Sequence, residues 1–322
     1  MEHAPRYTLE PFRMPMKLLK TENEDELTVE RILHARRYAL TLDKNRCVGC
    51  EICMIACPKE AIEVRKIPKE EGEKAKPPVV DVDEEKCHYC GICSSICPFG
   101  ALDVKVNGET VTPVVESESF PQLIREIEVD STKCDPRCLD IEDPCPLGLI
   151  EVRVQPPEEE GEAPATRGEK KNAQVLVDID RDFCPCCRVC EVKFPNGAIK
   201  VRKIVNGILR IDREKCPEGC HDCLDVCPIT GALYLSEDGK VHVNDLHCVY
   251  CGVCKIVCPE EGALELQRTS IRHTPLRSGA WNKALEKLTS TTEMTKELRT
   301  KSSKKLRESV EKRLLPGGSN HA

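Results

Sequence analysis

Short segments in which apolar and polar residues alternate recur six times along the chain, before and after a group of cysteines. The leading segments are YALTLDKNRC, PVVDVDEEKC, REIEVDSTKC, VLVDIDRDFC, GILRIDREKC and KVHVNDLHC, and the trailing ones are AIEV, ALDV, LIEV, AIKV, ALYL and ALEL. A period of two predicts half-buried strands. The chain therefore consists of six half-repeats of about 35 to 45 residues, each a strand, a cysteine loop with a short helix, and a returning strand.

A polar residue stands four positions before the first cysteine position of every half-repeat. Its side chain can accept a hydrogen bond from the backbone two residues on, which starts a loop. We expect these residues to have a structural and not a chemical role. They are Asp43, Asp83, Asp130, Asp180, Asp212 and Asn244.

The 23 cysteines fall into six groups, each closed by a proline. Four groups are complete: Cys47, Cys50, Cys53, Cys57; Cys87, Cys90, Cys93, Cys97; Cys216, Cys220, Cys223, Cys227; and Cys248, Cys251, Cys254, Cys258. The spacing C-x2-C-x2-C-x3-C-P is typical of ferredoxins, in which three cysteines hold one cubane cluster and the fourth ligates its neighbour. The sequence therefore predicts 4Fe-4S clusters.

Three other uses of cysteine fit the pattern less well. Structural zinc sites favour two ligand pairs with a longer spacer. Disulfides require an oxidising compartment, and the N-terminus has no apolar core of signal-peptide length. The spacing of Cys216, Cys220 and Cys223 matches radical S-adenosylmethionine enzymes, which leave one iron open, but here Cys227 and the complete sixth group supply further ligands.

The third and fourth groups each lack one cysteine. Ile141 occupies the third ligand position of KCDPRCLDIEDPCP, and Phe194 the fourth of FCPCCRVCEVKFP. If these half-repeats share a domain, the three cysteines of the fourth take Cys145 as their fourth ligand, and both substitutions fall on the other site. That site keeps only Cys134 and Cys138, and two apolar side chains would fill its cavity. Pairing the second half-repeat with the third and the fourth with the fifth would instead give two three-cysteine sites, enough for 3Fe-4S clusters.

We therefore expect five 4Fe-4S clusters and one lost site. The predicted ligand sets are Cys47, Cys50, Cys53 with Cys97; Cys87, Cys90, Cys93 with Cys57; Cys184, Cys187, Cys190 with Cys145; Cys216, Cys220, Cys223 with Cys258; and Cys248, Cys251, Cys254 with Cys227. Three cysteines remain, Cys134, Cys138 and Cys186. They are either buried thiols or ligands of a sixth metal with one ligand that is not cysteine.

Six half-repeats predict an α+β fold of three tandem two-cluster ferredoxin domains. The expected divisions are an N-terminal extension at 1–37, domains at 38–124, 125–206 and 207–267, and a basic helical tail at 268–322. The segments 68–78 and 156–173 lack periodicity and are predicted to be solvated, flexible loops. With only five Phe, five Tyr and one Trp and 32% charged residues, apolar cores would be weak, so we expect metal binding to stabilise the fold.

Other functional signals are few. The sequence contains no dinucleotide-binding glycine motif, no P-loop and no hydrolase motif, so we predict no catalytic site. No run approaches the ~20 apolar residues of a membrane span. We expect a cytoplasmic protein, free or peripheral to a membrane-bound complex. His88, His221 and His247 lie in or beside the cysteine loops and are interpreted as surface residues.

The motifs CVGCEICMIACP, CHYCGICSSICP and CVYCGVCKIVCP resemble those of the polyferredoxins. These are chains of tandem bacterial-type ferredoxin domains found beside hydrogenases, heterodisulfide reductases and formylmethanofuran dehydrogenases of anaerobic archaea. The resemblance covers roughly residues 38 to 267 and departs at Ile141 and Phe194. It implies one-electron transfer as a relay subunit of a larger redox enzyme. A freely diffusing carrier and a mainly structural scaffold are the alternatives.

The two ends carry no cysteine and favour the subunit interpretation. From Arg268 onward the chain has 13 basic and 5 acidic residues, and the stretch from 281 to 316 has an imperfect apolar stripe typical of a helix. We expect this helix to dock on a partner, either a redox enzyme subunit or a soluble ferredoxin. Folding back on the acidic body and binding an anionic membrane are the other options. No aromatic interleaving supports a nucleic-acid partner.

Overall fold

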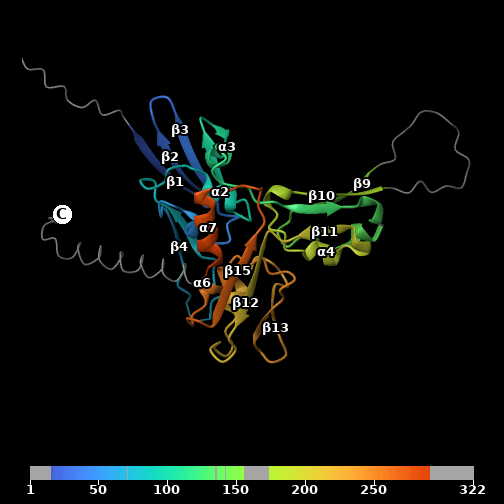
Figure 1. Cartoon of the computed structure of the whole chain (residues 1–322). Coiled ribbons are helices and arrows are strands. Elements are labelled where there is room, and N and C mark those ends of the chain that lie inside the picture. The colour runs from blue at the N-terminus through green and yellow to red at the C-terminus, as the bar shows by residue number, and fades with distance from the viewer. Residues whose placement is uncertain (1–15, 71, 135, 142, 156–173, 291–322) are drawn as a thin grey trace, which may run out of the picture.

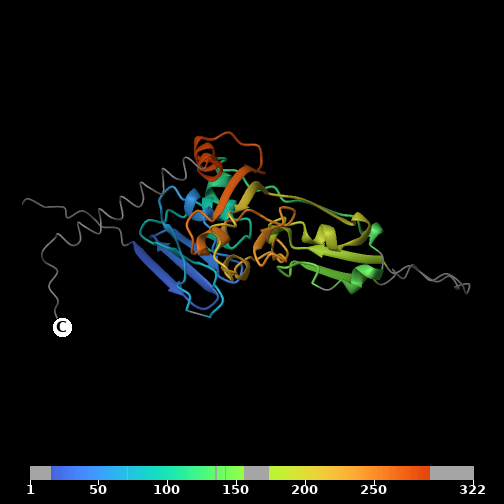
Figure 2. The ribbon, with the colours of Figure 1, turned by 90° about the horizontal axis from the view of Figure 1, so that it is seen from below.

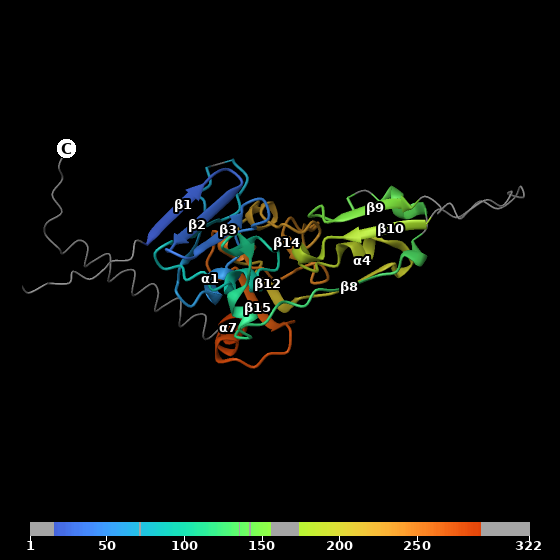
Figure 3. The same ribbon diagram turned by 90° about the horizontal axis from the view of Figure 1, so that it is seen from above.

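The computed structural model describes residues 16–70, 72–134, 136–141, 143–155 and 174–290. Strand pairing divides them into three units, which we call the first (17–110), the second (126–202) and the third (205–271). The second unit extends to one side of the other two in all three views (Figures 1, 2 and 3). The first and third units therefore lie side by side although the second separates them in sequence.

Each unit is built from two half-repeats by the same antiparallel pairing. The leading strand of the first half pairs with the trailing strand of the second half, and the two remaining strands pair with each other. The pairs are β3 (Arg37–Asp43) with β6 (Leu102–Val106), β4 (Ile62–Arg65) with β5 (Val79–Val82), β8 (Glu126–Val129) with β11 (Ile199–Arg202), β9 (Ile150–Gln155) with β10 (Gln174–Ile179), β12 (Val205–Ile211) with β15 (Leu264–Ile271), and β13 (Leu233–Leu235) with β14 (Val241–Val243). Among the described strands, none pairs the second half-repeat with the third or the fourth with the fifth.

Short helices lie within the cysteine groups, each of them including the third cysteine. The α-helices are α1 (Ile52–Ala56), α2 (Ile92–Ile96), α4 (Val189–Lys193), α5 (Asp222–Asp225) and α6 (Val253–Val257), and α3 (Pro113–Glu116) follows the first unit. Single 3-10 turns are η1 (Ser131–Lys133), η2 (Pro136–Asp140), η3 (Arg181–Phe183) and η4 (Pro195–Gly197). Gly91 and Gly252 precede α2 and α6 with φ of 85° and 92°. Only a residue without a Cβ adopts this geometry freely, so the two glycines fix the entry into each helix.

The polar residue before each cysteine loop has the predicted structural role in five half-repeats. The side chain accepts a hydrogen bond from the backbone N–H two residues on, at 2.9 to 3.2 Å. These residues are Asp43, Asp83, Asp130, Asp212 and Asn244. Asp180 makes no such bond to the 3-10 turn that follows it.

Part of the predicted N-terminal extension belongs to the first unit. β1 (Lys17–Glu22) and β2 (Glu26–Ile32) pair next to β3, and β7 (Glu109–Thr110) completes a five-stranded sheet in the order β1-β2-β3-β6-β7. Leu27 and Val29 of β2 are at most 2% exposed. The repeat itself begins with β3, but the domain boundary expected at residue 38 was wrong, because the apolar strand β2 packs on the same core.

The boundary expected at residue 267 was also wrong. β15 continues to Ile271, and Arg268, which we counted in the basic tail, is 2% exposed inside this strand. The tail then forms α7 (Gly279–Thr289), which begins where Ser278 Oγ accepts a hydrogen bond from the backbone of Trp281. Trp281 is 1% exposed and contacts the ring of Phe120 edge-on. The described part of the tail thus folds on its own chain, and residues 291–322 lie outside the described residues.

The loop at 68–78 is not a freely solvated segment. Lys69 Nζ contacts Asp222 Oδ1 at 2.5 Å, and the backbone N–H of Ala75 donates to Asp225 Oδ2 at 3.1 Å. Apart from residue 71, which is not described, this loop of the first unit lies against α5 of the third. The loop at 156–173 lies outside the described residues.

None of the helices that the structure describes is long and apolar enough to cross a membrane.

Candidate iron-sulfur sites

Cysteine side chains line four small cavities, each with apolar walls. In each cavity the first three cysteines of one half-repeat meet the last cysteine of the half-repeat paired with it. We number the predicted ligand sets in chain order: site 1 is Cys47, Cys50, Cys53 and Cys97; site 2 is Cys87, Cys90, Cys93 and Cys57; site 3 is Cys184, Cys187, Cys190 and Cys145; site 4 is Cys216, Cys220, Cys223 and Cys258; site 5 is Cys248, Cys251, Cys254 and Cys227. The four cavities are sites 1, 2, 3 and 5.

Site 4 and site 2 each combine three half-buried cysteines with one buried cysteine. In site 4, Cys216, Cys220 and Cys258 are half-buried, and only Cys223 is buried. Burial, together with the thiols of the other three, raises the pKa of Cys223 to about 12. The four thiols of site 4 are therefore also gathered, around Cys223.

The chemistry of the donors fits an iron-sulfur cluster. Burial raises the pKa of most of these thiols, to about 11 for Cys47 and about 12 for Cys248, so thiolates form here only with a compensating positive charge such as a metal. Backbone N–H groups of Ala61, Ala101 and Leu147 each donate to a ligand sulfur at 3.4 Å. Among the described residues, no three His, Cys, Asp or Glu side chains gather around one point that a single ion could occupy. The cysteines instead line cavity walls, and a cubane takes one ligand at each of four irons.

The sequence motifs did not reveal a set of cations at these sites. Arg31 donates to the carbonyl of Cys87 at 2.9 Å, Lys203 to that of Cys248 at 2.8 Å, and Lys240 to that of Cys216 at 2.8 Å. Arg125 donates to the carbonyl of Cys184 at 3.1 Å. Each cation comes from outside the cysteine loop that it contacts, so the spacing within the motifs carries no signal of it.

Comparisons with known proteins agree with this chemistry. A family described as a 4Fe-4S dicluster domain matches residues 46–101, and a second one with the same description matches residues 208–259. The polyferredoxin-like subunit of an aliphatic sulfonate oxidoreductase of Pyrococcus furiosus is 32% identical over 103 residues, 28% of this chain and 58% of that protein. Formate hydrogenlyase subunit 2 of Escherichia coli is 30% identical over 103 residues, 28% of this chain and 47% of that protein. The chain thus spans about half the length of these curated relatives.

A solved structure matches far more of the molecule. It is a chain of the formate dehydrogenase–heterodisulfide reductase–formylmethanofuran dehydrogenase complex of Methanospirillum hungatei, with 33% identity and a TM-score of 0.72. The match covers 85% of this chain and 91% of that one. The chain belongs to the polyferredoxins.

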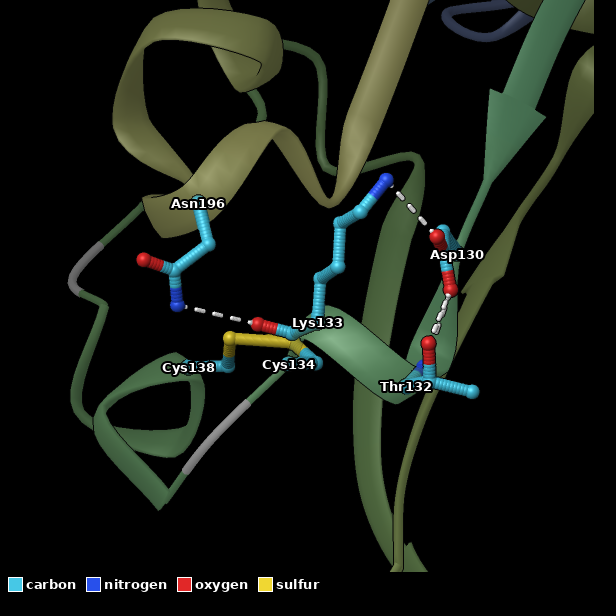
Figure 4. The surroundings of a disulfide bond; sticks show 6 residues. All are labelled: Asp130, Thr132, Lys133, Cys134, Cys138 and Asn196. Carbon is cyan, nitrogen blue, oxygen red and sulfur yellow. Dashed lines mark hydrogen bonds and ion pairs between the residues drawn. A yellow bond between two sulfur atoms is a disulfide. The ribbon is translucent and has the colours of Figure 1, made fainter.

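The polyferredoxin has a disulfide where its sixth site would be. Cys134 and Cys138 are bonded to each other, and both are buried (Figure 4). The side chain of Asn196, two residues after Phe194, donates to the carbonyl of Lys133 at 3.2 Å and so joins the two damaged loops. Phe194 is 3% exposed, and Ile141 is half-buried against the core.

The third leftover cysteine lies elsewhere in the polyferredoxin. Cys186 is completely buried, and its thiol lies 3.8 Å from the carbonyl of Cys184, in site 3. The structure therefore does not bring Cys134, Cys138 and Cys186 together, and the idea that the three share a sixth metal was wrong. Two of them form a disulfide, and the third packs behind a ligand loop.

Thiol pairs that belong to different sites show which of the sites are neighbours. Burial raises the pKa of Cys53 in site 1, and the thiol of Cys93 in site 2 adds to this effect. Burial likewise raises the pKa of Cys50 in site 1, with a contribution from Cys251 in site 5. Cys254 of site 5 is affected in the same way by Cys223 of site 4. These neighbours place the four sites in the order 2, 1, 5, 4.

Site 3 of the polyferredoxin lies beside the two middle sites of this row, sites 1 and 5. Arg125 donates to the carbonyls of Cys184 in site 3 and Cys97 in site 1, both at 3.1 Å. On the other side, Nδ1 of His247 lies 3.4 Å from the carbonyl of Cys187 in site 3, next to the first ligand of site 5. His247 is thus a half-buried contact between two units, not the surface residue that we expected. Sites 1, 3 and 5 come together where the three units meet.

Proposed function

We propose that this polyferredoxin relays single electrons through five 4Fe-4S clusters, as a subunit of a larger redox enzyme complex. A cubane bound by four thiolates takes up and passes on one electron at a time. The proposal is carried by the order of the sites: the thiol neighbours Cys93–Cys53, Cys50–Cys251 and Cys254–Cys223 form a continuous row. Sites 2 and 4 are the ends of this row, so they are the proposed points of entry and exit.

The chain's own residues fix this row in place. The swapped cysteines, such as Cys57 and Cys97, tie the two halves of a unit to each other's sites. Backbone N–H groups that donate to the sulfurs, and cations at the ligand carbonyls, favour an added negative charge at each site. Each side chain here is already oriented by the fold, so little reorganisation accompanies electron transfer.

We further propose three ferredoxin domains, at residues 17–124, 125–204 and 205–271, and the loss of one cluster from the middle domain. If electrons passed through the sites in the order of the sequence, the lost site would interrupt their path. The row 2, 1, 5, 4 bypasses the lost site, because it uses only the first and third domains. Site 3 then forms a side branch at the junction of sites 1 and 5.

The relatives support the choice of a complex subunit over a freely diffusing carrier. The polyferredoxin-like relative is a subunit of an oxidoreductase, and the solved relative lies in a multienzyme complex. We propose redox enzyme subunits as partners, no catalytic site on this chain, and a cytoplasmic location.

Two measurements on anaerobically purified protein test this function. Five clusters require about 20 iron atoms per chain, and six would give about 24. Affinity purification of the tagged full chain from its native host should bring down oxidoreductase subunits in fixed ratio. A chain that contains five clusters but purifies alone, and exchanges electrons with soluble donors, would instead be a diffusing carrier.

A further inference from the structure

One guanidinium group contacts ligand loops of two different units. Arg125, just before β8, donates through Nε to the carbonyl of Cys184 and through Nη2 to the carbonyls of Cys97 and Pro98, at 3.1, 3.1 and 3.4 Å. Cys184 is the first ligand of site 3, and Cys97 is the swapped fourth ligand of site 1. Arg125 is therefore shared between two sites, whereas Arg31, Lys203 and Lys240 each contact the ligand carbonyl of one site.

The two units approach very closely at this point. Gly100, three residues after Cys97, has a φ of 60°, and a Cβ there would lie 2.5 Å from the ring of Phe183, the residue before Cys184. The guanidinium of Arg46 lies over the same ring, 3.5 Å from its centroid. This contact keeps the loops of sites 1 and 3 together and leaves Arg125 only partly exposed to water.

The charge of Arg125 acts on the ligands of both sites. Its guanidinium donates to the backbone carbonyl of one predicted ligand in each site, Cys184 and Cys97, and so places its positive charge beside both. A cation that stabilises a thiolate also stabilises an added electron at the site that this thiolate ligates.

We propose that Arg125 is a positioning residue for electron exchange between site 1 and site 3: it connects the two ligand loops and raises the reduction potentials of both sites. The inference rests on the proposed relay, because it gives the side branch a defined connection to the main row. Beyond the relay, it names the pair of sites that exchange electrons and the residue that connects them. The connection runs from the carbonyl of Cys97 through the guanidinium to the carbonyl of Cys184.

The test is a redox titration of full-length, anaerobically loaded protein, followed by electron paramagnetic resonance. In Arg125→Gln, two of the five clusters should shift to lower potential. Each shift should correspond to a change on the order of tenfold in the one-electron equilibrium, which is about 59 mV. The matched control Arg31→Gln, which removes a cation from Cys87, should shift one cluster only.

A second variant separates charge from geometry. Arg125→Lys keeps the positive charge, but an ammonium group lacks the planar guanidinium fork that reaches the carbonyls of both Cys97 and Cys184. At least one of the two reduction potentials should therefore lie closer to the wild-type value than in Arg125→Gln. When Arg125→Gln is mixed with a reductant and freeze-quenched, the cluster at site 3 should be reduced more slowly than in the wild-type protein. Iron content and circular dichroism equal to wild type show that the variants are folded.

The outcomes distinguish this inference from the proposed relay. Unchanged potentials in folded, fully loaded Arg125→Gln, or equal shifts in all five clusters, would overturn the role of Arg125. If wild-type clusters titrate independently and no electrons pass between them, the relay itself fails, whatever the potentials of Arg125→Gln.

Discussion

Cys50 of site 1 and Cys251 of site 5 lie close enough for their thiols to interact, although they belong to the first and the third unit. Beside this contact, Arg268 from β15 donates to the carbonyls of Tyr250 and Cys251 at 2.9 and 2.8 Å. Its guanidinium also lies 3.7 Å from Glu51, the residue after Cys50. A buried ion pair thus crosses the seam between the first and third units, beside the cysteines of sites 1 and 5.

Removal of Arg268 should destabilise this seam. Arg268→Met leaves the buried carboxylate of Glu51 and two carbonyls without a partner, which costs about 3 kcal/mol or more. The apparent melting temperature of the loaded protein should fall by roughly 6 °C or more. Arg210→Met, on the exposed side of the neighbouring strand β12, is the control and should leave it within about 1 °C of wild type. Equal effects of both variants would argue against a structural role of the pair.

Loss of a swapped ligand should affect one cluster. Cys145→Ala removes the fourth ligand from site 3, so the iron content should fall from about 20 towards about 16 atoms, with a three-iron form in between. Cys134→Ala and Cys138→Ala should leave about 20. A loss of iron in either of the latter variants would mean that the third half-repeat holds metal after all.

A methyl group at Gly100 should force the first and second units apart. Gly100→Ala combines a left-handed backbone with a Cβ placed 2.5 Å from Phe183, whereas Gly108, with φ of 90°, has nothing within 4 Å. Both substitutions incur about 1 to 2 kcal/mol of backbone strain, and only the first adds a clash. Gly100→Ala should therefore lower the apparent melting temperature more and increase the radius of gyration measured by X-ray scattering. Identical values for the two variants would contradict the close approach.

The loop at 68–78 should become sensitive to protease when its anchor is removed. Lys69→Met abolishes the contact with Asp222, which is 8% exposed and would lose its ion-pair partner. Limited proteolysis should then cleave this loop faster than in wild type, at a protease concentration that leaves the rest of the chain intact. Lys74→Met, which changes an exposed lysine in the same loop, provides the comparison. Cleavage at an unchanged rate in Lys69→Met would show that other contacts hold the loop.

The strands, turns and cluster type could be predicted from the sequence because each depends on residues that are close together in the chain. Strands flanking the cysteine loops follow from alternation, and the turns at Asp43 or Asp212 from a side chain that bonds its own backbone. The cluster type follows from cysteine spacing, and the comparisons confirmed the family. In each case the residues that interact are few positions apart, or recur at a fixed period.

The contacts between units could not be predicted, since nothing in one segment indicates which distant segment it meets. Arg125, Arg268 and Lys69 are ordinary cations in the sequence, and each acquires its role through a residue of another half-repeat, namely Cys97, Glu51 and Asp222. β2 was missed because its apolar positions lie outside any cysteine repeat. Cys186 was grouped with Cys134 and Cys138 only because all three were left over, and the fold separates them.

The second unit extends to one side, while the first and third units lie side by side (Figures 1 and 3). This arrangement has a consequence for the order in which the protein becomes functional. During synthesis, sites 1 and 2 can form as soon as the first unit has left the ribosome, but the partner of Cys50 across the seam is Cys251, near the end of the cysteine-bearing region. In the proposed relay, a partly made chain, or one truncated after its second unit, would hold sites 1 and 2 but lack sites 4 and 5. Such a fragment would not pass electrons from one end of the row to the other, because the third unit, which is synthesised last, supplies the second half of the proposed path.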